Sequence, residues 1–97
     1  EIINLSPSKT KKQQYDIVGP ICETSDFLGK NRMLSLDEGN ILAILDTGAY
    51  GMTMSSNYNS RPKISELMVT GNNIHVIRER ESYQDLIRGE SLLPKAN

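Results

Sequence analysis

The sequence predicts a mainly β fold of four or five strands with one short helix near the C-terminal end. Short runs of β-branched and aromatic residues alternate with glycine, proline and asparagine, a pattern typical of strands joined by turns. The clearest case is Gly71-Asn72, which separates residues 66–70 from residues 73–78. Two β-prone runs around a two-residue glycine turn are a strong hairpin signal.

The first half of the chain contains three further segments of interest. Residues 2–5 are a short apolar run, and the pattern of residues 15–22 predicts a strand bent at Gly19-Pro20. Residues 24–36 contain glycine, lysine, asparagine and arginine in sequence, which indicates an irregular connection.

A turn signal at residues 37–40 precedes a continuous apolar run at residues 41–45. A run of this length is typical of a strand buried on both faces, although periodicity alone does not separate it from a short helix. Near the C-terminus, Ser82 and Asp85 have the spacing of a capping box, and we expect a short helix to begin there.

Composition excludes several classes of function. The 97 residues carry a formal net charge of -1, so bulk charge favours neither nucleic acid nor an anionic membrane as a partner. No apolar run approaches the ~20 residues of a membrane helix. A single cysteine excludes an internal disulfide framework and fits a cytoplasmic setting, and we expect no metal site. The abrupt, strand-like start without an initiator methionine suggests a piece of something longer.

Cys22 is the first candidate for chemistry. A lone cysteine is most often a small buried hydrophobe, but this one follows a backbone corner and precedes the polar residues Glu23 to Asp26. Acidic neighbours raise the pKa of a thiol, which favours a proton donor over a nucleophile. From the residues alone, Cys22 can be either a small buried hydrophobe or a thiol with a chemical role.

Two aromatic loops are further candidates, of which the Tyr50 loop is the more suggestive and the Tyr58 loop the weaker. Tyr50 lies between Gly48 and Gly51, where the backbone can approach a ligand closely, but packing beneath the loop is equally consistent with the pattern. Tyr58 is embedded in a polar run of serine and asparagine. His75, in the predicted hairpin, is best interpreted as structural.

Three segments together resemble a known family. The sequences GPICETSDFLG (residues 19–29), DTGAYGMTMSSNYNSRP (residues 46–62) and VIRERESYQDLIRGE (residues 76–90) are similar to the C-terminal part of the diaminopimelate decarboxylases, in the same order and spacing. The Cys-Glu pair resembles this branch rather than the ornithine type, which has Cys-Asp. Thr24 stands where serine is more usual in the family.

The resemblance implies a pyridoxal 5'-phosphate enzyme with an N-terminal (β/α)8 barrel, which supplies the Schiff-base lysine, and a C-terminal β-barrel or sandwich domain. Residues 1–90 would be part of that β domain and residues 91–97 a tail. The resemblance also implies a homodimer, because members of the family share their active sites across a dimer interface. If the roles of the matching family residues are carried over to this chain, Cys22 would protonate the substrate carbon and Glu23 would bind the distal ammonium group of the substrate. Tyr50 would contact substrate or cofactor. Tyr58 and Asn59 would line the cofactor pocket.

The implied reaction converts meso-2,6-diaminopimelate to L-lysine and carbon dioxide, and this segment alone is expected to be inactive. The alternatives are a sister decarboxylase of the ornithine or arginine type, a non-catalytic dimerisation or regulatory β domain, and a cysteine hydrolase using Cys22 and His75. The last lacks a visible oxyanion arrangement and places acids beside the thiol.

Overall fold

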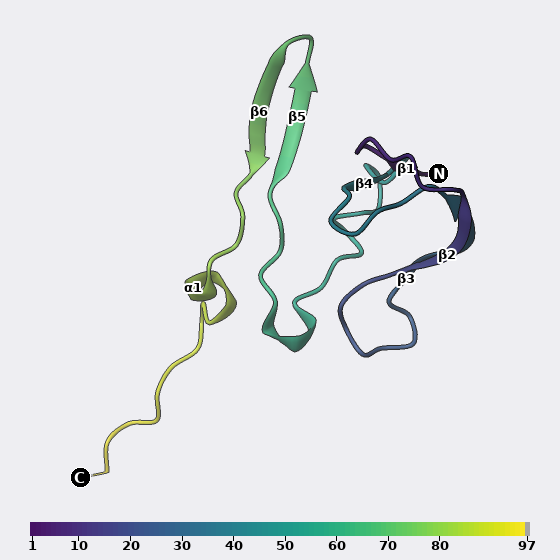
Figure 1. Ribbon diagram of the computed structural model, residues 1–97. Helices are drawn as coiled ribbons and strands as arrows, with labels where there is room; N and C mark the ends of the chain where they lie inside the picture. The colour runs from purple at the N-terminus through teal and green to yellow at the C-terminus, as the bar shows by residue number, and fades with distance from the viewer. Residues whose placement is uncertain (97) are drawn as a thin grey trace. The chain divides into compact units, whose positions relative to one another are not determined.

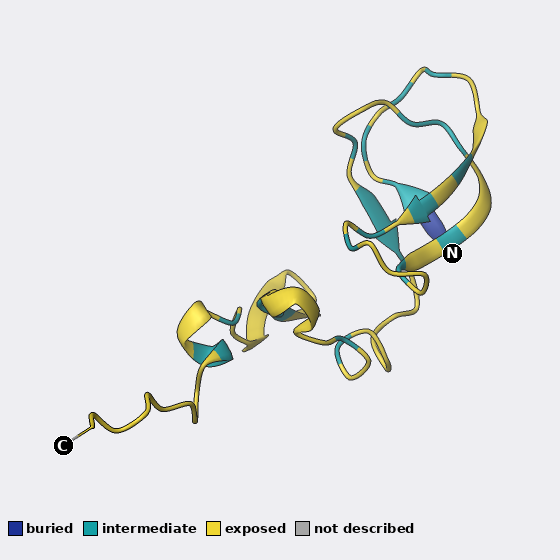
Figure 2. Ribbon diagram, turned by 90° about the horizontal axis from the view of Figure 1, so that it is seen from below, coloured by how far each residue is buried: buried dark blue, intermediate teal, exposed yellow. Residues whose placement is uncertain are grey.

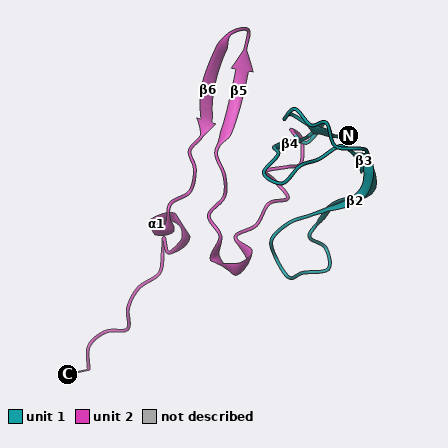
Figure 3. Cartoon of the chain, viewed as in Figure 1, with its two compact units in different colours: residues 1–47 teal, residues 48–97 magenta. Residues whose placement is uncertain are grey.

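A computed structural model of the chain describes residues 1–96 and confirms the mainly β fold (Figure 1). It divides into two compact units, Glu1–Thr47 and Gly48–Asn97 (Figure 3). The elements are, in order, β1 (Ile2–Asn4), β2 (Gln13–Val18), β3 (Phe27–Leu34), β4 (Leu42–Ile44), the 3-10 turn η1 (Tyr58–Ser60), β5 (Glu66–Thr70), β6 (Asn73–Arg78) and α1 (Tyr83–Leu86).

The first unit contains two antiparallel pairs, β1 with β4 and β2 with β3. Ile2 is the buried hydrophobic residue of this unit (Figure 2). Its side chain reaches β3 at Gly29, where an added Cβ would lie 2.7 Å from the Ile2 methyl carbon. The absence of a side chain at Gly29 therefore lets β1 pack closely against β3 at this point.

The β2–β3 pair corrects two sequence-based expectations. The predicted strand ends at Val18 rather than near Cys22, and the segment expected to be irregular contains β3, the longest strand. Its polar residues lie mostly on exposed positions. Asn31 adopts a left-handed φ of 55°, and its N–H donates to the Asp16 carboxylate at 2.9 Å, so the strand contains an irregularity in register that its sequence pattern conceals.

The run at residues 41–45 forms β4, as a strand rather than a helix, but it is not buried on both faces. All three β4 residues are half-buried, because β4 pairs only with β1 in a two-stranded sheet. The six described strands also exceed the four or five expected, chiefly because β3 was missed.

The second unit is built on the β5–β6 hairpin, which confirms the prediction at Gly71-Asn72. Thr70 pairs with Asn73, and Gly71 has a φ of +58°. Beyond the last paired residues, the N–H of Glu81 donates to the Lys63 carbonyl at 3.0 Å, so the antiparallel approach of the two segments continues past the strands. The capping box at α1 is also confirmed, with Ser82 and Asp85 each accepting from the other's backbone N–H.

The hairpin exposes apolar side chains on both strands, including Val69, which is 66% exposed, and Ile74, which is 68% exposed. Two-stranded hairpins are marginal on their own in water.

Among the described residues, no helix is long and apolar enough to cross a membrane.

Candidate functional site

The Cys22 loop, residues 19–26, connects β2 to β3 and presents the only cysteine to solvent. Its two ends are joined by a bond from the Gly19 N–H to the Asp26 carbonyl at 2.9 Å, and the Asp26 N–H donates to the Glu23 carbonyl at 3.1 Å. The loop is thus a closed turn rather than a continuation of the strand, and this resolves the open question of whether Cys22 is buried: its thiol is exposed.

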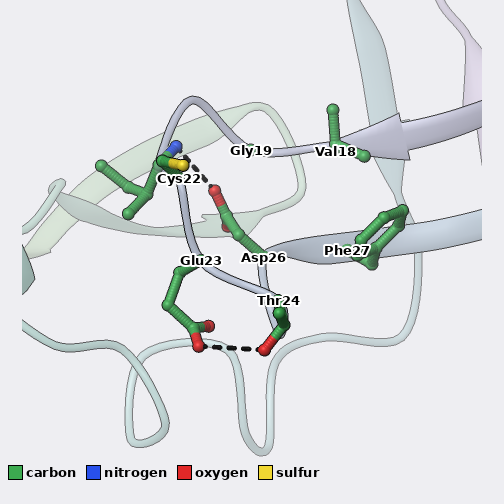
Figure 4. Close-up of a pocket in the computed structure, with 8 residues that line it drawn as sticks. Val18, Gly19, Cys22, Glu23, Thr24, Asp26 and Phe27 are labelled. Carbon is green, nitrogen blue, oxygen red and sulfur yellow. Dashed lines mark hydrogen bonds between the residues drawn. The ribbon is translucent and has the colours of Figure 1, made fainter.

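Glu23 is exposed beside Cys22 and is folded back onto its own loop. Its Oε2 atom accepts from the Ser25 N–H at 2.7 Å and from the Ser25 hydroxyl, and its Oε1 atom accepts from the Thr24 hydroxyl at 3.3 Å. These bonds, that of the Ser25 hydroxyl foremost, hold the pKa of Glu23 below its ordinary value. The carboxylate is therefore held in its charged form, and Figure 4 shows it directed towards Thr24.

A shallow cleft of about 360 Å³ lies within the Cys22 loop and extends from Val18 at the end of β2 to Phe27 at the start of β3 (Figure 4). The apolar side chains of these two residues stand on the flanking strands, while Cys22, Glu23 and Thr24 lie along the turn between them. The cleft is thus bordered both by apolar residues and by the polar residues of the turn, Asp26 included.

The Tyr50 turn, residues 48–54, places its aromatic side chain in solvent. The Tyr50 carbonyl accepts from the Met54 N–H at 2.9 Å and from the Thr53 hydroxyl at 3.3 Å. The backbone of Tyr50 therefore builds the turn, while the residue is 70% exposed and its phenol can donate a hydrogen bond to a ligand.

The Tyr58 turn, residues 57–61, has a strained backbone. Asn59 and Ser60 are both left-handed, with φ of 58° and 57°. Asparagine tolerates this region and serine does so less readily, so two such residues in succession require support from the surroundings. Tyr58 itself is 58% exposed.

That support comes from Glu81. Its Oε2 atom accepts from the Asn57 side-chain amide at 2.6 Å and from the Lys63 N–H at 2.7 Å. The bond from the Lys63 backbone is the main reason that the pKa of Glu81 lies below its ordinary value, and the Asn57 amide adds to it. One carboxylate therefore fixes both ends of the polar segment that carries Tyr58 and Asn59.

The structure brings some predicted residues together and keeps others apart. Cys22 and Glu23 share the Cys22 loop in the first unit, whereas Tyr50, Tyr58 and Asn59 lie in two turns of the second. His75 is exposed on β6. Within residues 1–96, no group of three or more His, Cys, Asp or Glu side chains could hold a metal ion.

Sequence reasoning missed two organising residues. Asp26 was considered only as a charge near the thiol, although its place at the end of a glycine-started turn could have suggested a backbone contact. Glu81 is the second of these residues. Nothing in its local sequence connects it to Asn57, which lies 24 residues earlier in the chain, before the hairpin.

Comparison with known proteins identifies the class first. Residues 1–48 match the family described as "Pyridoxal-dependent decarboxylase, C-terminal sheet domain". The chain therefore belongs to the pyridoxal-dependent decarboxylases, of which it carries the C-terminal sheet domain.

The individual relatives are narrower in kind. The chain is 55% identical over 98% of its length to diaminopimelate decarboxylase of Vibrio cholerae and 53% identical over 92% to that of Pseudomonas aeruginosa. It spans 23% and 21% of those two proteins.

Solved structures agree. The crystal structure of diaminopimelate decarboxylase from M. jannaschi matches with a TM-score of 0.87 at 40% identity, over 97% of this chain and 22% of that one. That of the Helicobacter pylori protein complexed with L-lysine matches with a TM-score of 0.80 at 45% identity, over 91% and 22%. The resemblance stated from the sequence is confirmed, and these findings do not favour its alternatives.

Proposed function

We propose that this chain is the C-terminal part of a diaminopimelate decarboxylase, which converts meso-2,6-diaminopimelate to L-lysine and carbon dioxide in the cytoplasm. The observation that carries the proposal is the exposed Cys22–Glu23 pair within a chain about half identical to proteins of that name. The complex of one neighbour with L-lysine is consistent with the proposed product. Residues 1–90 would form the β-domain segment and residues 91–97 a tail.

The residues present fit a contribution to a pyridoxal 5'-phosphate site. The exposed phenol of Tyr50 can donate to a phosphate or substrate oxygen, and the supported Tyr58 turn offers a phenol and the Asn59 amide. The Schiff-base lysine would come from an N-terminal (β/α)8 barrel. When bound, the cofactor's chemistry is to accept the electron pair left on the substrate carbon as carbon dioxide departs.

Cys22 would be the general acid. Its S–H would donate a proton to the substrate carbon, and the resulting thiolate would regain a proton from solvent. The loop is exposed, so it can enter a site formed largely by another chain. As the family resemblance implies, we propose that Cys22 acts in the active site of the partner subunit of a homodimer.

Glu23 would select the substrate by its second amine. A carboxylate has about four acceptor positions, and the described contacts use two at Oε2 and one at Oε1. The remaining position on Oε1 can accept from a substrate ammonium without dismantling the loop. A substrate without that amine would leave the ionised carboxylate unpaired as the site closes, which is how polar sites reject shorter analogues.

The test is a Cys22→Ala substitution in the full-length protein. We expect decarboxylation of meso-diaminopimelate to fall by about a hundredfold or more, the range of a lost general acid, while the cofactor absorbance band persists. His75→Ala is the matched control and should leave the rate unchanged. Full turnover and an unaltered product in Cys22→Ala would exclude the proton-donor role, and turnover of ornithine or arginine in preference would identify a sister enzyme instead.

A further inference from the structure

Asp26 has a different role from its acidic neighbour Glu23. Asp26 is half-buried, and its carboxylate accepts from the Ile21 N–H at 2.9 Å. Figure 4 shows the Asp26 side chain pointing across the loop, with a dashed line marking its hydrogen bond. Ile21 directly precedes Cys22. The Asp26 side chain therefore fixes the peptide from which the cysteine projects.

The backbone of the same residue closes the rest of the turn. Its carbonyl accepts from Gly19, and its N–H donates to the carbonyl of Glu23. Asp26 thus contacts the first residue of the loop, the residue before Cys22 and the residue after it. All of its hydrogen bonds within the described residues go to the backbone of its own loop.

Gly19 contributes to this arrangement because it has no side chain. A Cβ added at Gly19 would collide with both carboxylate oxygens of Asp26. The side chain of Asp26 therefore occupies the volume that any other residue at position 19 would fill. A glycine and a carboxylate seven positions apart are matched to each other.

We propose that Gly19 and Asp26 form a clamp that fixes the loop backbone from which Cys22 and Glu23 project. In this role Asp26 is a positioning residue, because its hydrogen bonds go to the loop backbone. The catalytic consequence of the clamp rests on the proposed function, whereas its geometry stands on the contacts alone.

The test is a double-mutant cycle of Gly19→Ala and Asp26→Ala in the full-length dimer. Hydrogen exchange of the Ile21 amide is measured, together with the alkylation rate of the Cys22-containing peptide by iodoacetamide, followed by mass spectrometry. We expect Asp26→Ala to speed Ile21 exchange about tenfold, as for loss of a bond to a charged group. Gly19→Ala should do the same by displacing the carboxylate, and the double variant should be no faster than Asp26→Ala.

Two further variants separate a clamp from general loosening. Asp26→Asn keeps an oxygen that can accept from Ile21, so it should restore exchange and alkylation to within about threefold of the parent, the scale of one modest hydrogen bond. Asp16→Ala removes the same kind of bond, Asp16 to the Asn31 N–H, and should disturb Asn31 while leaving Ile21 and Cys22 unchanged.

The proposal is overturned if Ile21 exchange is unaltered in Asp26→Ala, if Gly19→Ala adds its full effect to Asp26→Ala, or if Asp26→Asn is as fast as Asp26→Ala. In kinetics, Asp26→Ala should lower kcat about tenfold with the KM for cofactor unchanged, and Asp26→Asn should recover most of it. Exchange and alkylation do not depend on turnover. If the parent protein fails to decarboxylate diaminopimelate, that result would contradict the proposed function and would leave the evidence for the clamp unaffected.

Discussion

The Cys22 loop and the Tyr58 turn are each held by one carboxylate, but the two carboxylates come from different distances along the chain. Asp26 is five residues from its amide partner, Ile21, and belongs to the same loop. Glu81 is 24 residues from Asn57 and is returned to it by the β5–β6 hairpin. The first loop therefore depends on its own sequence, and the second depends on a correctly paired hairpin.

The largest expected difference between the two loops is chemical. Glu23→Gln removes a charge from the proposed ammonium site and should lower kcat/KM for diaminopimelate by about tenfold to a hundredfold, the value of hydrogen bonds to charged groups. Tyr58→Phe removes one neutral donor and should cost about twofold to tenfold. Steady-state kinetics of both variants in the full-length protein provide the measurement, and a greater loss in Tyr58→Phe would reverse the assigned roles.

The second difference is structural and should appear when the hairpin turn is damaged. Gly71 has a φ of +58°, a conformation that costs a β-branched residue about 1–2 kcal/mol. Gly71→Val should therefore weaken the register that places Glu81 opposite Lys63, and amide exchange at Lys63 should rise. The Ile21 amide in the other unit should not respond.

Gly71→Asn is the matched control for that experiment, because asparagine tolerates the left-handed region. It should leave Lys63 close to the parent. An equal response of Ile21 and Lys63 to Gly71→Val would show that the two loops are not held independently.

The smallest expected effect is a shared one, seen with pH. The pKa values of Glu23 and Glu81 are both lowered by hydrogen bonds to their charged forms. Such bonds contribute stability above the ordinary glutamate pKa of about 4.3 and lose it as pH falls through the lowered folded values. In an NMR titration, both side-chain carboxyl carbons should titrate below about 4.3, and the Ser25 and Lys63 amides should shift in step with their partners. Midpoints at or above 4.3 would contradict the hydrogen bonds described.

Much of the local structure was predictable because it depends on neighbouring residues. The Gly71-Asn72 turn follows from the tolerance of glycine for a positive φ, and the Ser82–Asp85 capping box follows from side chains that contact backbone three positions away. The strand β3 was not predictable in this way. Its polar residues face solvent in a two-stranded sheet, so the alternation that marks a half-buried strand is weak.

The sequence by itself determined that the chain is mainly β, that it resembles the C-terminal part of the diaminopimelate decarboxylases, and that Cys22 and Glu23 stand together. Only the tertiary structure decided that the thiol is exposed, that Asp26 fills the space beside Gly19, and that Glu81 supports the Tyr58 turn. The physical reason is that turns and caps depend on contacts between residues that are close in the sequence. Exposure and close approach depend on where the folded backbone brings residues in space.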